Sequence, residues 1–300
     1  MTWTILKLIE WTSEYLKKQG IENPRLESEI LLAHVLGKKR IDLYLEFDHS
    51  VEPPELSTYK LLIQRRVKHE PIQYLTGRQE FWSLDFKVGP GVLIPRPETE
   101  CLVEKALILK NKNSHSEQLC HPEGRRPEGS LQILDLGTGS GVLAIVLAKE
   151  LPQSHIWAGD ISERALSYAR ENAQTHGVSS QIHFVKSDLF SALDPSQKFD
   201  LIISNPPYVA EEEWTCLPTH IKEFEPPEAL RGGEQGIDFH LKILEEAPKF
   251  LKAGGSIILE IAPSQDVMLK EYLEKQKNVS NFESVQDYEH RQRVLVVHYG

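Results

Sequence analysis

Cysteine is scarce in this chain, with three in 300 residues. Cys101, Cys120 and Cys216 lie far apart and form no Cys-X-X-Cys pair. This spacing argues against a disulfide framework and against a zinc site, and it indicates a reducing compartment. The 12 histidines also lack the regular spacing of metal ligands. We therefore expect no metal centre.

Long apolar runs are missing as well. None reaches the ~18–20 residues that a transmembrane helix requires, and the first residues, MTWTILKLIEW, lack the basic start of a secretory signal. We expect a cytoplasmic protein without a membrane segment. Basic residues are a minority, because 34 Lys and Arg stand against 44 Asp and Glu, for a formal net charge of -10. Proteins that hold nucleic acid usually present a basic face, so direct binding of nucleic acid is not expected.

The N-terminal quarter of the chain has helical patterning. In residues 1–75, apolar side chains recur at helical spacing. One helix is expected to begin at Asn23-Pro24, where an N-cap residue precedes proline, and to end at Gly37. No glycine-rich loop occurs in this part. The pattern predicts a small helical domain that recognises a substrate and does not catalyse.

Two connecting segments follow. Residues 76–110 predict a β-hairpin around Gly89-Pro90-Gly91 and a linker. Residues 111–130, NKNSHSEQLCHPEGRRPEGS, are polar and rich in Gly, Pro and Ser, and their charges balance. This composition predicts a flexible insertion.

Residues 131–300 alternate between short apolar segments and helical segments, which is the pattern of a parallel sheet covered on both faces. The expected strands are LQILDLG, HIWAGD, QIHFVKSD, FDLIISN and GSIILEI. Two further candidates, ESVQDY and RVLVVHYG, follow without a helix between them. We therefore predict an α/β, Rossmann-like catalytic domain whose sheet is mostly parallel and has an antiparallel edge.

A glycine-rich loop follows the first of these strands: Asp135-Leu136-Gly137-Thr138-Gly139-Ser140-Gly141. Glycines allow a tight turn and the close approach of a ligand to the backbone. The spacing is GxGxG, so the third glycine of a dinucleotide fingerprint is missing at Val142. Asp135 would repel a pyrophosphate, but it suits a ligand with a sulfonium and an ammonium group. S-adenosylmethionine carries both groups and no phosphate.

Two later strand ends supply further acids. Asp160 lies 21 residues after Gly139 and ends the second strand, where a carboxylate reaches the ribose hydroxyls of an adenosine. Asp188 ends the third strand and is placed to meet the adenine edge, with Leu189 beside the ring. Open α/β sheets bind ligands at the carboxyl ends of their strands. The pattern therefore predicts a site for S-adenosylmethionine.

The sequence Asn205-Pro206-Pro207-Tyr208 follows the fourth strand and is the most specific signal in the chain. Two prolines cannot continue a central strand, so they fix a rigid exit from the sheet. The Asn205 side-chain carbonyl and the Pro206 backbone carbonyl can accept hydrogen bonds from one NH2 group. Tyr208 offers a flat face to a planar group. The motif predicts methyl transfer to an amide or aromatic amine nitrogen, driven by alignment and electrostatic stabilisation.

Taken together, DLGTGSG, the acid of GDIS, SDLF and SNPPYV resemble the HemK/PrmC family, the protein-(glutamine-N5) methyltransferases. Other segments resemble the same family, namely PRLESEILLAHVLG, PIQYLTGRQEFW, VLIPRPETE and FEPPEALRGGEQG. The resemblance implies a methyltransferase that uses S-adenosylmethionine. It also implies a substrate, the glutamine of the Gly-Gly-Gln loop in class-1 peptide chain release factors.

The resemblance and the strand-end pattern together give the expected site residues. The cofactor is expected on Gly137, Thr138, Gly139, Ser140, Gly141, Asp160, Asp188, Leu189 and Asn205. The substrate glutamine is expected on Asn205, Pro206, Pro207 and Tyr208, and the catalytic roles fall to Asn205, Pro206 and Tyr208. One departure from the family pattern is the length of segment 111–130. Another is Leu189, where some members have an aromatic residue, so we expect weaker stacking on adenine.

The residues leave alternatives open. A glutamine of a ribosomal protein suits the same motif, and so does the exocyclic amine of adenine in DNA. An enzyme acting on DNA needs a basic recognition surface and a way to flip the base, for which the acidic chain gives no sign. A nicotinamide dehydrogenase would require GxGxxG without Asp135. A non-catalytic binding protein would have no need of the intact Asn-Pro-Pro-Tyr sequence.

Overall fold

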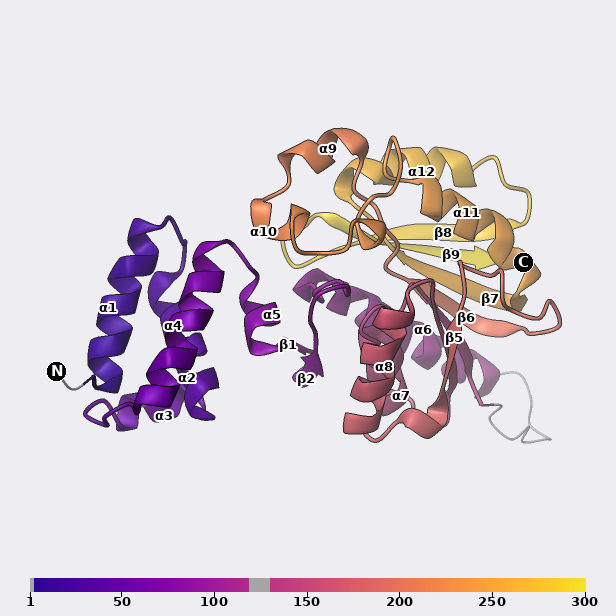
Figure 1. Ribbon diagram of the computed structural model, residues 1–300. Coiled ribbons are helices and arrows are strands. Elements are labelled where there is room, and N and C mark those ends of the chain that lie inside the picture. The colour runs from indigo at the N-terminus through magenta and orange to yellow at the C-terminus, as the bar shows by residue number, and fades with distance from the viewer. Residues whose placement is uncertain (1–2, 119–129) are drawn as a thin grey trace. The chain divides into compact units, whose positions relative to one another are not determined.

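The computed structural model describes residues 3–118 and 130–300. They form two compact units (Figure 1). The first unit consists of Met1–Arg78 and Pro218–Phe224, and the second consists of Gln79–Leu217 and Glu225–Gly300. No helix within these described ranges is long and apolar enough to cross a membrane.

The first unit is helical. Its helices are α1 (Ile5–Lys18), α2 (Pro24–Leu36), α3 (Arg40–Leu45), α4 (Pro53–Val67), α5 (Ile72–Thr76) and α10 (Thr219–Lys222). The apolar sides of α1 to α5 meet in one core, in which Ile9, Leu31 and Tyr59 are almost completely buried. Pro24 opens α2, and Gly37 ends it with a φ of 62°. Both limits that the sequence predicts for this helix are confirmed.

The second unit is built on a seven-stranded sheet in the order β5-β4-β3-β6-β7-β9-β8. The strands are β3 (Gln132–Leu136), β4 (His155–Asp160), β5 (Ile182–Lys186), β6 (Phe199–Ser204), β7 (Leu251–Glu260), β8 (Val279–Gln286) and β9 (Gln292–Tyr299). Strands β3 to β7 pair in parallel, while β9 pairs antiparallel with both β7 and β8. The prediction of a mostly parallel sheet with an antiparallel edge is confirmed.

Helices cover both faces of this sheet (Figure 1). The covering helices are α6 (Glu100–Gln118), α7 (Val142–Glu150), α8 (Glu163–Thr175), α11 (Asp238–Glu246) and α12 (Asp266–Leu273). The unit also contains α9 (Glu211–Cys216) and the 3-10 turns η1 (Pro97–Thr99), η2 (Ser179–Gln181), η3 (Pro227–Ala229), η4 (Ala247–Lys249) and η5 (Pro263–Gln265). Successive strand residues point to opposite faces. Ile202 therefore packs in the core formed with α11 and α12, and Ile203 packs in the core formed with α6 and α7. Burial on both faces explains why the strands are continuous apolar runs.

A two-stranded hairpin precedes the sheet, formed by β1 (Arg78–Phe81) and β2 (Leu84–Lys87). The prediction of its turn around Gly89-Pro90-Gly91 is wrong, because the strands are joined at Trp82 and Ser83. Both residues have positive φ, 53° and 56°, as a two-residue hairpin turn requires. The backbone N–H of Trp82 donates to the Glu100 carboxylate at 2.7 Å. A contact from a distant residue thus supports a turn that usually contains glycine.

Helix α6 extends to Gln118, so it includes the first residues of the predicted insertion. The remainder of that segment, 119–129, lies outside the described residues. A flexible insertion therefore stays a prediction, as do the domain limits drawn at residues 75, 110 and 130.

Candidate active site

The sheet has a topological switch point between β3 and β6. From β3 the chain continues to β4 and β5 on one side, while β6 and β7 lie on the other side. Open α/β sheets bind ligands outside the strand carboxyl ends at such a point. The register pairs Leu136 with Ser204, and the Ser204 hydroxyl donates to the Leu136 carbonyl at 2.6 Å. Gly137 and Asn205 therefore leave the sheet as neighbours.

The glycine loop is attached to the end of β4. The backbone N–H of Gly137 donates to the Gly159 carbonyl at 2.8 Å. All three loop glycines have positive φ, with 69° at Gly137, 57° at Gly139 and 86° at Gly141. A Cβ atom on Gly137 would meet no atom within 4 Å, whereas one on Gly141 would lie 3.0 Å from the Ala169 Cβ. Gly137 thus borders open space that a ligand can fill, and Gly141 allows α7 and α8 to approach closely.

Asp160, the last residue of β4, also shapes the loop. Its Oδ2 accepts from the Gly139 backbone N–H at 2.9 Å, and its Oδ1 accepts from the Ser162 backbone N–H at 2.8 Å. Burial raises the pKa of the Asp160 carboxyl, and these two hydrogen bonds oppose the rise. Carboxylate oxygens have further lone pairs, so Asp160 can hold the loop and still accept from a ligand.

Asp135 precedes the loop and is completely buried. The Thr138 hydroxyl donates to its Oδ2 at 2.6 Å, but its Oδ1 has no hydrogen-bond partner in the described part of the chain. Burial raises the pKa of Asp135 to about 7, while the hydrogen bond from Thr138 and the proximity of the Ala144 backbone N–H lower it. The buried Ser140 hydroxyl also lacks a partner there. Two unsatisfied polar atoms at one loop fit a site that a polar ligand completes.

The turn after β5 contains Asp188 and Leu189. Leu189 has a φ of 47°, which a branched residue rarely adopts. The Ser187 hydroxyl stabilises this conformation by donating to the Leu189 carbonyl at 2.7 Å. Leu189 is half-buried and Asp188 is exposed. Since β5 lies beside β4, this strained turn lies at the same sheet edge as Asp160, where strain is often found at ligand sites.

The Asn-Pro-Pro-Tyr sequence leaves β6 without regular secondary structure, as its prolines predict. Asn205 donates through Nδ2 to the Thr99 hydroxyl at 3.1 Å. Pro206 is buried, and Pro207 and Tyr208 are half-buried. Burial raises the pKa of the Tyr208 hydroxyl well above its usual value, so this side chain is a neutral phenol. The prolines restrict the backbone of this segment, and the hydrogen bond to Thr99 fixes the Nδ2 end of the Asn205 side chain.

A glycine-rich segment packs against this exit. The Gly232 backbone N–H donates to the Val209 carbonyl at 2.9 Å. A Cβ atom on Gly232 would lie 2.7 Å from the Pro207 carbonyl oxygen, and one on Gly236 would lie 2.3 Å from the Tyr208 carbonyl oxygen. Only glycine allows the two segments to approach so closely. This stretch belongs to the segments that resemble the family, but nothing in the sequence predicts its contact with the motif.

Glu260, the last residue of β7, is not among the predicted site residues. Glu260 is completely buried, and its Oε2 accepts from the Thr99 hydroxyl at 2.7 Å. Burial raises the pKa of Glu260 to about 7, whereas the Thr99 hydrogen bond and the positive charge of Arg293 lower it. The Glu260 backbone carbonyl lies 2.8 Å from Nε2 of His240, whose pKa burial lowers to about 4. The one signal for Glu260 in the sequence is its place as an acid at the end of an apolar strand, which it shares with Asp160.

Comparisons with known proteins agree with this geometry. Residues 7–77 match the family described as PrmC N-terminal domain, and residues 127–295 match the family described as methyltransferase domain. Over 293 residues the chain is 38% identical to a release factor glutamine methyltransferase of Rhodopirellula baltica, which covers 98% of this chain and 95% of that protein. Over 263 residues it is 41% identical to the protein of the same name in Geobacter sulfurreducens, with 88% and 86% covered. This chain belongs to the release factor glutamine methyltransferase family.

The fold of this family member also occurs in a solved methyltransferase structure from Pyrococcus furiosus. The TM-score is 0.50 at 20% identity, and the match covers 79% of this chain and 98% of that one. At this identity the similarity shows the fold alone. Together with the family matches, it confirms the predicted Rossmann-like methyltransferase domain and the resemblance to the HemK/PrmC family.

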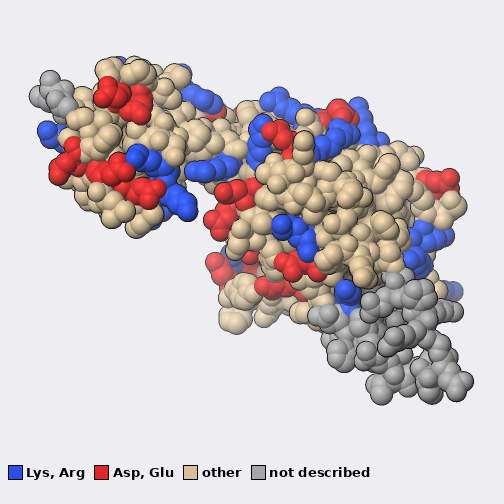
Figure 2. Space-filling view, turned by 90° about the horizontal axis from the view of Figure 1, so that it is seen from below, with Lys and Arg blue, Asp and Glu red and all other residues tan. Residues whose placement is uncertain are grey.

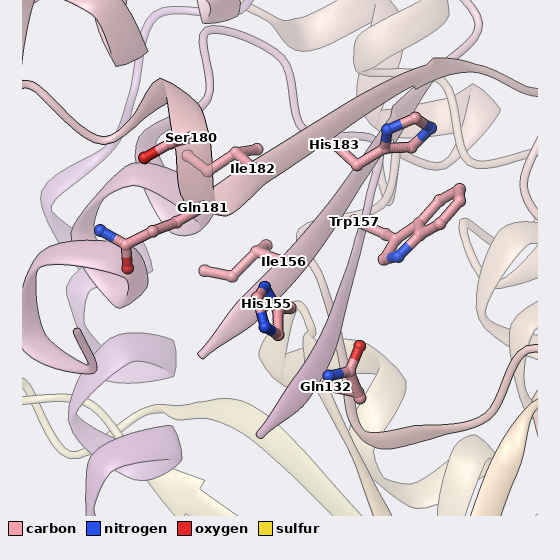
Figure 3. A pocket seen from close by; sticks show the side chains of 8 residues that line it. All are labelled: Gln132, His155, Ile156, Trp157, Ser180, Gln181, Ile182 and His183. Atoms are coloured by element: carbon pink, nitrogen blue, oxygen red, sulfur yellow. The ribbon is translucent and has the colours of Figure 1, made fainter. Parts of the chain in front are cut away.

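A surface depression of about 390 Å³ lies at the amino ends of the strands, opposite the candidate active site (Figure 3). Its lining residues are Gln132, His155, Ile156, Trp157, Ser180, Gln181, Ile182 and His183. They belong to the amino ends of β3, β4 and β5 and to the turn before β5. None of the predicted site residues lines the depression, so it is separate from the candidate active site.

The structure gathers the predicted site residues at the carboxyl ends of neighbouring strands. The glycine loop follows β3, Asp160 ends β4, Leu189 follows β5, and Asn205 to Tyr208 follow β6. Asp188 lies in the same turn as Leu189 and is the most exposed of the predicted acids. Among the side chains that the structure describes, no group of three or more His, Cys, Asp or Glu could hold a metal ion.

Proposed function

We propose that this protein transfers a methyl group from S-adenosylmethionine to the side-chain amide nitrogen (N5) of the glutamine in the Gly-Gly-Gln loop of class-1 peptide chain release factors. The observation that carries the proposal is the adjacency of Gly137 and Asn205, which the pairing of β3 with β6 enforces. Relatives that are 37% to 41% identical and bear the name release factor glutamine methyltransferase support the choice of substrate.

The loop and the strand ends are suited to the cofactor. When bound, S-adenosylmethionine supplies a methyl group on a sulfonium that is already a good leaving group. The residues proposed to hold it are Gly137, Thr138, Gly139, Ser140, Gly141, Asp160, Asp188, Leu189 and Asn205. The fit is supported by the open space at Gly137 and by Oδ1 of Asp135, which has no hydrogen-bond partner among the residues that the structure describes. Asp160 accepts from the ribose hydroxyls, and Leu189 borders the adenine.

The Asn-Pro-Pro-Tyr sequence is suited to an amide. An amide nitrogen is a poor nucleophile because its lone pair is delocalised into the carbonyl. Asn205 Oδ1 and the Pro206 carbonyl accept its two N–H groups, which fixes the amide plane and stabilises positive charge that develops on nitrogen. Tyr208 stacks on the plane, and Pro207 keeps the segment rigid. Rate enhancement comes from alignment. The N–CH3 bond forms as the S–CH3 bond breaks, the surplus N–H proton passes to solvent, and S-adenosylhomocysteine is the second product.

The charge distribution favours a protein substrate over DNA. The net charge is -10, and basic and acidic side chains are interspersed on the face shown in Figure 2. Duplex DNA is usually held by a continuous basic surface. We propose that the helical domain of residues 1–75 recognises the release factor and that the reaction takes place in the cytoplasm.

The test is the transfer of a labelled methyl group to three candidate substrates: a class-1 release factor, ribosomal proteins and adenine-containing DNA. We expect label in the release factor, on the glutamine of the Gly-Gly-Gln loop when the product is mapped by mass spectrometry. A release factor with glutamate in place of that glutamine is the matched control, because it keeps the shape and has no amide NH2. Label in DNA or in ribosomal proteins but not in the release factor would overturn the proposal.

A further inference from the structure

A short chain of hydrogen bonds leads from Asn205 into the interior. Asn205 Nδ2 donates to Thr99 Oγ1 at 3.1 Å, and Thr99 Oγ1 donates to Glu260 Oε2 at 2.7 Å. Thr99 and Glu260 are both almost inaccessible to solvent. The register of β6 and β7 pairs Ser204 with Leu259. Asn205, which follows β6, is therefore a neighbour of Glu260, which ends β7. Thr99 comes from η1 and bridges them.

The direction of these hydrogen bonds follows from the chemistry of the groups. An ionised carboxylate only accepts, so the Thr99 hydroxyl hydrogen points to Glu260. The Thr99 oxygen then has only lone pairs left for Asn205. Of the two ends of the Asn205 amide, the NH2 end alone can meet those lone pairs. Oδ1 is therefore the end that remains for another partner.

We propose that Glu260 and Thr99 are positioning residues for methyl transfer, which fix the Asn205 amide so that Oδ1 faces the N–H of a planar amide substrate. The inference rests on the proposed function and adds two residues that neither the motif nor the family resemblance assigns. If the Asn205 amide turned over, it would present an NH2 group to the substrate NH2. Two donors would then face each other, and the substrate would lose its alignment.

The groups around Glu260 determine whether its carboxyl is ionised, and the ionised form is the one that fixes the Asn205 amide in a single orientation. The groups that face it are Thr99 and Glu98 from η1, Arg293 from β9, Tyr208 after β6, Cys101 from α6 and, at its backbone, His240 from α11. Arg293 favours the ionised carboxyl, while burial and the charge of Glu98 favour the protonated one.

With its pKa raised to about 7 by burial, Glu260 changes ionisation near neutral pH. A protonated Glu260 can donate to Thr99, and the Thr99 hydroxyl can then donate to Asn205. Both amide orientations are possible in that state, so the single orientation is lost as the pH falls.

The experiment compares Thr99→Val with Thr99→Ser in single-turnover methylation of a release factor at saturating cofactor. Valine keeps the shape of threonine and removes the hydroxyl, whereas serine keeps the hydroxyl. We expect Thr99→Val to lower the rate about 10–10²-fold, as misalignment does, and Thr99→Ser to recover most of the rate. Thr175→Val is the matched control, because the Thr175 hydroxyl bonds to a carbonyl on the exposed side of α8.

Glu260→Gln tests the same relay by a second route. Its amide can offer Thr99 either a donor or an acceptor, so we expect a lower rate and loss of the wild-type fall in rate below about pH 7. Because both residues act through Asn205, combining Glu260→Gln with Thr99→Val should lower the rate little beyond the larger single effect. Cofactor affinity measured by calorimetry should stay close to wild type in each variant.

Three outcomes overturn the inference. The first is a wild-type rate for Thr99→Val, and the second is a Thr99→Ser rate as low as that of Thr99→Val. The third is a loss of rate that accompanies weaker cofactor binding or a lower melting temperature, because a purely structural role would produce that result. Failure of the proposed function has a different signature. In that case the wild-type protein itself transfers no methyl group to the release factor, and the inference falls with it.

Discussion

Replacing Asn205 by alanine tests the centre of the proposed mechanism. The change removes the Oδ1 acceptor and the Nδ2 hydrogen bond to Thr99. It leaves the Ser204 hydroxyl bond to Leu136 in place, and Asn205 itself is only half-buried, so the sheet should remain folded. Loss of one acceptor that acts in the transition state costs about 10²–10³ in rate, or about 2.7–4 kcal/mol. We expect a loss of that size in turnover.

Asn205→Asp makes the test sharper because it keeps the shape. Its carboxylate would place an oxygen against the Thr99 oxygen, which has already given its hydrogen to Glu260. It would also bring a second negative charge close to a buried carboxyl. We therefore expect Asn205→Asp to be no faster than Asn205→Ala well above pH 7, where Glu260 is ionised, although it retains an acceptor.

The assay is the single-turnover rate at saturating cofactor and release factor, with cofactor affinity and melting temperature measured in parallel. Asn281→Ala is the matched control, since Asn281 is exposed on β8. Near wild-type rates for Asn205→Ala would make Asn205 a structural turn residue and refute the mechanism. A fast Asn205→Asp would show that the Thr99 contact does not set the orientation of the amide.

Further expectations follow from the same site. Asp160→Ala should weaken cofactor binding by roughly 1.5–3 kcal/mol, the usual cost of losing a charged hydrogen bond, and unchanged affinity in calorimetry would contradict its assignment to the ribose. Gly232→Ala would bring a Cβ atom within 2.7 Å of the Pro207 carbonyl, so we expect slower turnover with cofactor affinity retained, and a wild-type rate would show that the motif tolerates the shift. Burial raises the pKa of Glu260 from 4.5 to about 7, so the folded state binds the carboxyl proton more tightly than the unfolded state does. This proton contributes to stability below about pH 4.5, and the contribution is lost as the pH rises from about 4.5 to about 7. Thermal melts of Glu260→Gln should therefore change less than wild type over that range, and equal pH dependence would contradict the shift.

Local signals in the sequence predicted much of this structure. Pro24 and Gly37 mark the ends of α2 because proline and left-handed glycine each have one favourable position there. The apolar strands predicted the parallel sheet, and the parallel sheet placed the glycine loop and Asn205 at one edge. These features depend on periodicity and backbone geometry, which neighbouring residues determine.

Features that depend on distant contacts were not predictable in the same way. The hairpin turn at Trp82 has positive φ without glycine and is supported by Glu100. Thr99 and Glu260 are 161 positions apart in the chain, and no spacing rule connects them. Their importance appears only when the ends of β6 and β7 lie side by side.

The buried carboxyl of Glu260 also bears on substrate choice. The Thr99 and Tyr208 hydroxyls both interact with this carboxyl, and both oppose the rise in its pKa that burial causes. A carboxylate has one property that a neutral side chain lacks, because it can only accept. In the proposed mechanism, acceptance at Glu260 makes Thr99 an acceptor for Asn205, and the Asn205 oxygen is then the group that meets the substrate. An acceptor in that place suits the NH2 of glutamine and opposes the carboxylate of glutamate, so we expect Glu260 and Thr99 to favour an amide substrate.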